Sequence, residues 1–265
     1  MLIMKILVTA AMVLALSAIS ERVGPRTAGI LAGFPLGIAV SLFFIGLEQG
    51  AAFAAQSSVS AIGGLGAALV FCAAYWQASA RLTVMNAAGS SVAAILAFLG
   101  AAAIIRALPQ DRWVLLGVVA ALTVAAAFAF RGIKVEGGGT RPRIKLGPRV
   151  LAFRAGLASA LVLLITGLAG VVGETWAGLL SGFPVTLYPV LLIAHLTYAK
   201  EVAHGIIKGF PFGIGSLVIC ALAASALLEP LGVYGGMAAA IALAGIYLAT
   251  VSVVVRREGS RKPAA

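Results

Sequence analysis

The sequence predicts an all-α, polytopic membrane protein with nine transmembrane helices, arranged as a 4+1+4 inverted-topology repeat in which helices 2 and 7 are broken. Three observations carry this prediction. The chain is 62% hydrophobic and only 10% charged, with Asp111 as its single aspartate, which leaves too little polar surface for a soluble domain. Its apolar runs are long and do not alternate, which argues against barrel strands. Its two ends also match one another at an offset of 149 residues.

Nine apolar runs, each near the roughly 20 residues that a helix needs to cross a bilayer core, follow one another along the chain. They are 2–20, 27–48, 57–78, 84–105, 113–130, 150–172, 176–198, 205–227 and 233–255. The first run also has the features of a signal peptide, because an early lysine precedes an apolar stretch that ends in small residues. Arg22 and Arg26 directly after it disfavour export, and the run has an internal copy, so we interpret it as the first helix.

The basic residues divide sharply between the two membrane sides that nine spans define. Sixteen of the 19 fall on one side, and only Lys5, Arg106 and Arg112 fall on the other. Cytoplasmic loops carry such an excess, so we expect the N-terminus outside and the C-terminus in the cytoplasm of a bacterial inner membrane. The net charge of +11 therefore reflects topology and does not indicate a nucleic-acid partner. The lipid bilayer is the expected partner, with a homodimer as an open alternative.

The internal repeat is clearest in AGILAGFPLG at 28–37, which returns as AGLLSGFPVT at 177–186. The same offset aligns further pairs without a gap: Lys5 with Arg154, Gly64 with Gly213, and Gly66 with Gly215. Spans 1–4 match spans 6–9, and because span 5 crosses once between them, the second copy is inverted. The expected units are a four-span repeat at 1–106, a linker span with a basic cytoplasmic loop at 107–149, a second repeat at 150–256 and a basic tail at 257–265.

The repeat unit resembles the GlpM-like family of small four-span membrane proteins. The resemblance rests on the A-G-x-L-x-G-F-P element at 28–35 and 177–184. It also rests on the polar turn one helix later, which reads Glu48-Gln49-Gly50 in one copy and Lys200-Glu201 in the other, and on Ile193-Ala194-His195 ahead of the second turn. The resemblance implies a duplicated and fused four-span unit associated with polysaccharide and glycerol metabolism, and it implies no particular substrate.

The Gly-Phe-Pro elements predict helix breaks at 33–35 and 182–184, because proline lacks an N–H and disfavours helical geometry in the residue before it. Proline also suits the start of a helix, so each break should begin a half-helix inside the membrane, with free N–H groups and partial positive charge at its N-terminus. Inverted symmetry brings the two ends together, which predicts an anion or carboxylate site. A kink that serves packing alone is the alternative. Replacing Gly33 or Gly182 with leucine is expected to stop transport without unfolding the chain.

The candidate substrate-binding residues surround these breaks. They are Gly33, Phe34, Pro35, Gly182, Phe183, Pro184, Thr186, Tyr188 and Asn86. Five basic residues are candidates for an entry vestibule that attracts anions: Lys200, His204, Lys208, Arg154 and Lys5. Lys5 and Arg154 are each expected first of all to snorkel to the membrane surface, and their matched placement permits a second role as symmetric charges that flank a central site. The carboxylates near the spans fall at span ends, which counts against a pump built on a buried acid.

These features favour a transporter of a small anionic or polar metabolite. A non-transporting or lipid-handling component of cell-envelope or polysaccharide assembly is one alternative, and a channel is another. The sequence has no catalytic constellation, no metal-ligand spacing and no phosphate-binding loop, so we expect no enzyme, no metal and no cofactor.

Overall fold

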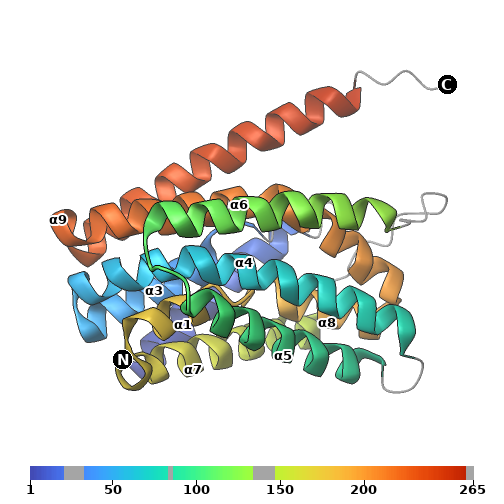
Figure 1. Cartoon of the computed structure of the whole chain (residues 1–265). Helices are drawn as coiled ribbons and strands as arrows, with labels where there is room; N and C mark the ends of the chain where they lie inside the picture. The colour runs from blue at the N-terminus through green and yellow to red at the C-terminus, as the bar shows by residue number, and fades with distance from the viewer. Residues whose placement is uncertain (21–32, 83–85, 134–146, 261–265) are drawn as a thin grey trace.

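A computed structural model of the protein describes residues 1–20, 33–82, 86–133 and 147–260, without the side chains of 16–20 and 251–260. Within these ranges all regular secondary structure is helical. The helices are α1 (Leu2–Ser20), α3 (Leu36–Gln49), α4 (Ala51–Arg81), α5 (Asn86–Arg106), α6 (Arg112–Ala129), the short 3-10 helix η1 (Phe130–Gly132), α7 (Pro148–Ser181), α8 (Leu187–Thr197) and α9 (Lys200–Ser260). Most run along a common direction, and the last part of α9 slants away from the bundle (Figure 1).

Five helical segments are long and apolar enough to cross a membrane. They are Ala51–Arg81, Asn86–Arg106, Arg112–Gly132, Pro148–Ser181 and Lys200–Thr250. Shorter apolar helices at Leu2–Ala15, Leu36–Gln49 and Leu187–Thr197 lie among them. The described residues therefore agree with the predicted all-α membrane class, while the count of nine spans stays a prediction.

α4 lies at the centre of the bundle. In the most apolar stretch of α4, 83% of the residues are buried inside the protein, whereas the corresponding share is 33% in α5 and 22% in α6. α4 contacts α3, α5, α6, α7 and α9. Gly63, Gly64 and Gly66 allow this crowding, because neighbouring helices approach the α4 backbone where these residues have no side chain. The outer faces of α5 and α6 carry exposed apolar side chains, such as Leu96 and Val124, that suit contact with lipid.

Two helices bend at a glycine with a left-handed backbone. α7 bends at Gly173 (φ 79°, ψ 169°), and α9 bends at Gly232 (φ 69°, ψ 172°). Gly50, between α3 and α4, has a similar conformation (φ 95°, ψ 161°). This region of backbone space is essentially restricted to glycine. Each bend divides one helix into two parts, and Figure 1 shows the two parts of α9 diverging from the bend.

α6 begins at the only aspartate of the chain. The Asp111 carboxylate accepts hydrogen bonds from the backbone N–H groups of Trp113 (2.9 Å) and Val114 (3.2 Å). This N-cap satisfies two of the four donors that the first turn of a helix leaves free. Asp111 therefore has a structural role at the start of α6.

Candidate functional site

The first Gly-Phe-Pro element forms a tight turn directly ahead of α3. The N–H of Leu36 donates to the carbonyl oxygen of Phe34 (2.8 Å), and the N–H of Ala39 donates to that of Pro35 (2.9 Å). Residues 33–35 are not helical, and α3 begins after them. The segment ahead of this turn lies outside the described residues, so the predicted break of helix 2 is visible only from its second half.

The second Gly-Phe-Pro element repeats this turn 149 residues later. The N–H of Val185 donates to the carbonyl oxygen of Phe183 (2.7 Å), and the N–H of Tyr188 donates to that of Pro184 (2.8 Å). α7 ends before residues 182–186 and α8 begins after them. The break predicted at 182–184 is therefore present, and it extends two residues further.

Each break lies against a glycine from the other half of the chain. A Cβ atom added to Gly33 would overlap the backbone of Gly213 in α9, and one added to Gly182 would overlap the backbone of Gly64 in α4. At the offset of 149, Gly33 corresponds to Gly182 and Gly64 corresponds to Gly213, so each contact is the counterpart of the other. Backbones approach this closely only where side chains are absent.

The two breaks also meet one another. A Cβ atom added to Gly37, in the first turn of α3, would lie 3.4 Å from Cγ2 of Thr186 and 3.4 Å from Cβ of Val185. Gly37 and Thr186 are themselves counterparts at the offset of 149. The N-termini of α3 and α8 therefore come together, and their partial positive charges favour an anion over a cation at this point.

Two small cavities flank the meeting point of the breaks. Val185 and Thr186 line both of them. Leu65 and Phe210 complete one cavity, and Arg154 contributes to the other. In each, the space open to the centre of a water molecule is about 10 Å³, which is room for about one water molecule. The break residues thus surround only small cavities in this conformation.

Arg154 is a buried cation beside the second break. Arg154 is 3% exposed, so the prediction that it snorkels to the membrane surface is wrong. It lines a cavity with Val185 and Thr186 instead of an open vestibule. Among the described residues, no carboxylate forms an ion pair with it. A guanidinium attracts negative charge and can donate several hydrogen bonds, so a cavity that it lines suits an anionic group.

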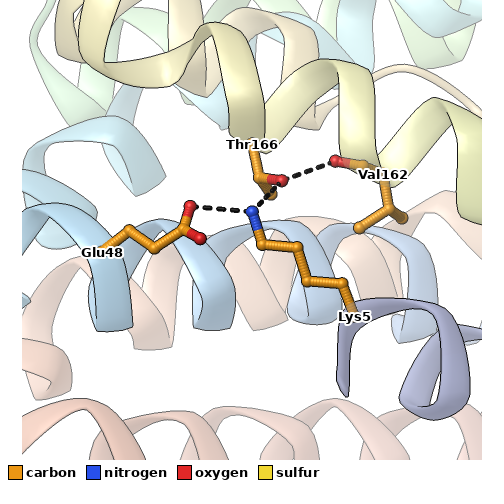
Figure 2. A network of polar contacts seen from close by, with 4 residues as sticks. All are labelled: Lys5, Glu48, Val162 and Thr166. Atoms are coloured by element: carbon orange, nitrogen blue, oxygen red, sulfur yellow. Dashed lines mark hydrogen bonds and ion pairs between the residues drawn. The ribbon is translucent and has the colours of Figure 1, made fainter. Parts of the chain in front are cut away.

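Lys5, the counterpart of Arg154, is also buried, but its charge is neutralised inside the protein. Its Nζ donates to Oε2 of Glu48 (2.7 Å) and to Oγ1 of Thr166 (2.7 Å), and Thr166 in turn donates to the carbonyl oxygen of Val162 (2.8 Å; Figure 2). Lys5 is only 5% exposed. The predictions of snorkelling and of a vestibule role for Lys5 are therefore both wrong, and the ion pair ties α1 to α3 and α7.

Aromatic rings crowd the second break. The Phe183 ring packs edge-to-face on Phe71 (5.5 Å between ring centroids) and on Phe98 (5.0 Å). The Tyr188 ring packs on Phe71 in the same way (5.6 Å) and is 8% exposed. Phe34, the counterpart of Phe183, is half-buried. Phe183 and Tyr188 thus fix the break against α4 through their rings.

Asn86 serves the turn between α4 and α5. Its Nδ2 donates to the carbonyl oxygens of Ser79 (2.9 Å) and Leu82 (2.7 Å), and its Oδ1 accepts from the Ser90 hydroxyl (3.1 Å). It lines neither cavity at the breaks. The prediction that Asn86 belongs to the substrate site is therefore corrected, because its amide is occupied in joining two helices.

Lys200, His204 and Lys208 follow one another by one turn at the start of α9, but they do not form an open basic vestibule. His204 is 8% exposed, and its Nε2 lies 2.7 Å from Oγ of Ser79. Lys208 donates to the carbonyl oxygen of Ile133 (2.6 Å), the residue directly after η1. Lys200 is half-buried. Two of the three basic groups are thus engaged with other helices.

A hydrogen-bonded cluster near the end of α4 is not predicted by the sequence. Nδ1 of His195 lies 2.9 Å from the Tyr75 hydroxyl, one turn away from the contact between His204 and Ser79. Tyr75 and Ser79 are fully buried. The available signal was the pair of hydroxyls four residues apart in an apolar helix. The nine-residue spacing of the two histidines did not indicate that they lie near each other, because the chain turns between α8 and α9.

No family model, curated protein or solved structure matches this chain. The resemblance to the GlpM-like family therefore stays a prediction. The chemistry of the breaks is the remaining guide to function: two helix N-termini and a buried arginine converge on small cavities, a combination that suits a negatively charged or strongly polar group.

Proposed function

We propose that the protein is an integral-membrane transporter of a small anionic or polar metabolite in a bacterial inner membrane. The observation that carries this proposal is the buried Arg154 side chain, which lines a cavity together with Val185 and Thr186 of the second break. The N-termini of α3 and α8 meet at the same residues, so the local potential is positive. The nearby Lys5 adds little to it, because Glu48 neutralises its charge.

We propose that the chain crosses the membrane nine times as a 4+1+4 inverted repeat, with the substrate between the repeats. The contacts Gly33–Gly213 and Gly182–Gly64 support a pseudo-two-fold axis, because each contact joins the residues that correspond to those of the other in the opposite repeat. The bends at Gly173 and Gly232 supply two of the reversals that nine crossings need. The start of α1 and the end of α9 lie at opposite ends of the bundle, as an odd number of crossings requires (Figure 1).

The small size of the cavities favours a carrier over a channel. A channel needs a continuous water-filled path, whereas the cavities at the breaks each hold about one water molecule. In the proposed cycle this conformation is closed, and the substrate enters when the two repeats shift against each other. The glycine contacts lie where such a shift would occur, because no side chains interlock there.

The expected affinity suits a carrier. A hydrogen bond from a charged group such as Arg154 contributes about 1.5–3 kcal/mol, and each helix N-terminus contributes on the order of 1 kcal/mol. A few such terms, less the costs of ordering and desolvation, correspond to dissociation constants from about micromolar to millimolar.

Lipid handling is the second candidate function, favoured by an apolar cavity of about 220 Å³ between α1, α3 and the last part of α9. Phe43 and Tyr234 form part of its wall, with ring centroids 5.5 Å apart. This cavity would accept an acyl chain. Within the part of the chain that the structure describes, its lining has no basic residue to hold a lipid headgroup, so we prefer transport of a soluble metabolite.

The test is uptake by purified protein in liposomes across a panel of organic anions, cations and neutral solutes. We expect a subset of the anions to be transported, and Arg154→Gln to reduce that uptake at least tenfold, about 1.4 kcal/mol. Arg149→Gln is the matched control, because Arg149 is exposed on the same helix, and it should leave uptake unchanged. Uptake of cations alone, or equal uptake by the Arg154→Gln variant, would contradict the proposal. Movement of a fluorescent lipid alone would favour lipid handling.

A further inference from the structure

The two histidines of the chain are held by two hydroxyls on one face of α4. His195, in the last turn of α8, lies 2.9 Å from the Tyr75 hydroxyl, and His204, in the first turns of α9, lies 2.7 Å from the Ser79 hydroxyl. Tyr75 and Ser79 are fully buried, His204 is 8% exposed and His195 is half-buried. Two groups that titrate near neutral pH are therefore placed at one junction of α4, α8 and α9.

The hydrogen bonds of Ser79 determine which nitrogen of neutral His204 carries the proton. The Ser79 hydroxyl donates its only hydrogen to the carbonyl oxygen of Trp76 (3.0 Å). Both contacts of Ser79 are then satisfied when its oxygen accepts from an Nε2–H of His204. Nδ1 is left as the basic nitrogen, so His204 can take up a second proton without losing its bond to Ser79.

His195 is different, because its bonded atom is the one that changes on protonation. The Tyr75 hydroxyl can donate to Nδ1 only while Nδ1 is unprotonated. Once Nδ1 carries a proton, it must donate to the Tyr75 oxygen, and the hydroxyl hydrogen has to turn elsewhere within a fully buried site. The Tyr75 ring also packs edge-to-face on the imidazole (5.8 Å between centroids). Protonation of His195 therefore changes the contact between α4 and α8.

The surrounding charges limit the site to one proton. The charged groups that act on both imidazoles are Glu201 and Lys200 at the start of α9, and His195 also acts on His204. α4 contributes only the two hydroxyls, and α5 contributes the uncharged amide of Asn86. Glu201 offsets one imidazolium, whereas a second would be repelled by the first and by Lys200.

From this geometry we infer that His195 and His204 form a proton-binding site that takes up a single proton and couples it to the position of α8. α8 is the half-helix that begins at the second break, so its two ends contact the substrate cavity and the histidine pair. A shift of α8 on protonation would directly change the shape of the cavity at its N-terminal end. The coupling rests on the proposed transport function, while proton binding does not.

Proton binding is tested by NMR on full-length protein with ¹⁵N-labelled histidine in nanodiscs. The chain has only two histidines, so His195→Gln and His204→Gln assign every imidazole signal. We expect the Nε2–H tautomer for His204 at pH 8 and the uptake of one proton by the pair between pH 8 and pH 5. Tyr75→Phe should shift the titration of His195, whereas Tyr234→Phe, at an exposed tyrosine, should not. Two independent titrations near pH 6.5, or no titration at all, would overturn the inference.

Coupling is tested in liposomes with a pH-sensitive dye inside. A substrate anion and a proton should move together in a ratio of one to one, and His195→Gln should abolish accumulation driven by a pH gradient. Anion flux that ignores the gradient would overturn the coupling and leave the transport proposal standing. The absence of any flux would overturn the transport proposal, and the NMR titration would then decide the proton site by itself.

Discussion

Gly182, in the break after α7, lies so close to Gly64 of α4 that a single added Cβ atom would overlap the Gly64 backbone. The same relationship holds between Gly33 and Gly213, at the positions that the offset of 149 predicts. Both breaks are thus seated directly on the backbone of a helix from the other half. A contact of this kind depends on the shape of the two backbones alone, because there are no side chains to interlock.

We predict that Gly182→Ala and Gly33→Ala each lower the free energy of unfolding by about 1–3 kcal/mol, since the added methyl group overpacks the contact. Backbone strain is not the cause, because Gly182 has ordinary helical angles (φ −73°, ψ −7°). Reversible unfolding of purified protein in mixed micelles would measure the effect. Gly156→Ala in α7 is the control, since open space surrounds that position. Equal stabilities of the three variants would contradict the packing described here.

The same overlap corrects one expectation from the sequence. Leucine at Gly33 or Gly182 was expected to stop transport without unfolding the chain. The structure places backbone atoms, which cannot turn aside, where its Cβ would lie. Both leucine variants should therefore be strongly destabilised, and neither can serve as a clean test of transport.

The buried ion pair in Figure 2 should be asymmetric in its response to mutation. The Lys5 side chain is 6% exposed and that of Glu48 is 26% exposed. Glu48→Gln leaves a buried ammonium group uncompensated and should cost about 3 kcal/mol, whereas Lys5→Met leaves a carboxylate that can reach water and should cost less. Unfolding of the two single variants and the double variant gives the coupling energy. Strictly additive effects would show that the pair does not form.

Gly232 should be intolerant of any side chain, because its backbone conformation is one that other residues rarely adopt. We predict that Gly232→Ala lowers the free energy of unfolding by about 1–3 kcal/mol. Gly245→Ala lies in the same helix with open space around it, and it should be neutral or slightly stabilising. Thermal unfolding followed by tryptophan fluorescence compares the two variants. A stable Gly232→Ala protein would rule out the bend at this residue.

Local chemistry made the break at 182–184 predictable, because proline and glycine act on the chain within a few residues. Partnerships across the bundle were not predictable in the same way. Lys5 was expected to snorkel to the membrane surface, yet Glu48, 43 residues away, neutralises its charge inside the protein. The histidine cluster escaped notice for a similar reason, since Tyr75 is 120 residues from His195. Asn86 was misplaced because embedded amides suggest ligands, whereas this one closes a turn.

The distribution of the basic residues predicts an external N-terminus and a cytoplasmic C-terminus. Alkaline phosphatase folds into an active enzyme only outside the cytoplasm, and some fluorescent proteins become fluorescent only inside it. We expect a C-terminal fusion to the fluorescent protein to be bright and the corresponding phosphatase fusion to be inactive. An active phosphatase at the C-terminus would contradict the predicted orientation, and together with an external N-terminus it would require an even number of crossings and remove the basis for an inverted repeat.

The central claim is that substrate passes between the two Gly-Phe-Pro breaks, and a disulfide across them tests it most directly. A Cβ on residue 37 would lie 3.4 Å from Cβ of Val185, close to the separation of about 3.5–4.5 Å found in disulfides. The variant combines Gly37→Cys and Val185→Cys with alanine at Cys72 and Cys220, the buried free thiols. We predict that oxidation stops anion uptake into liposomes and that reduction restores it, while each single-cysteine variant is unaffected by oxidant. Undiminished uptake by fully cross-linked protein would contradict the claim.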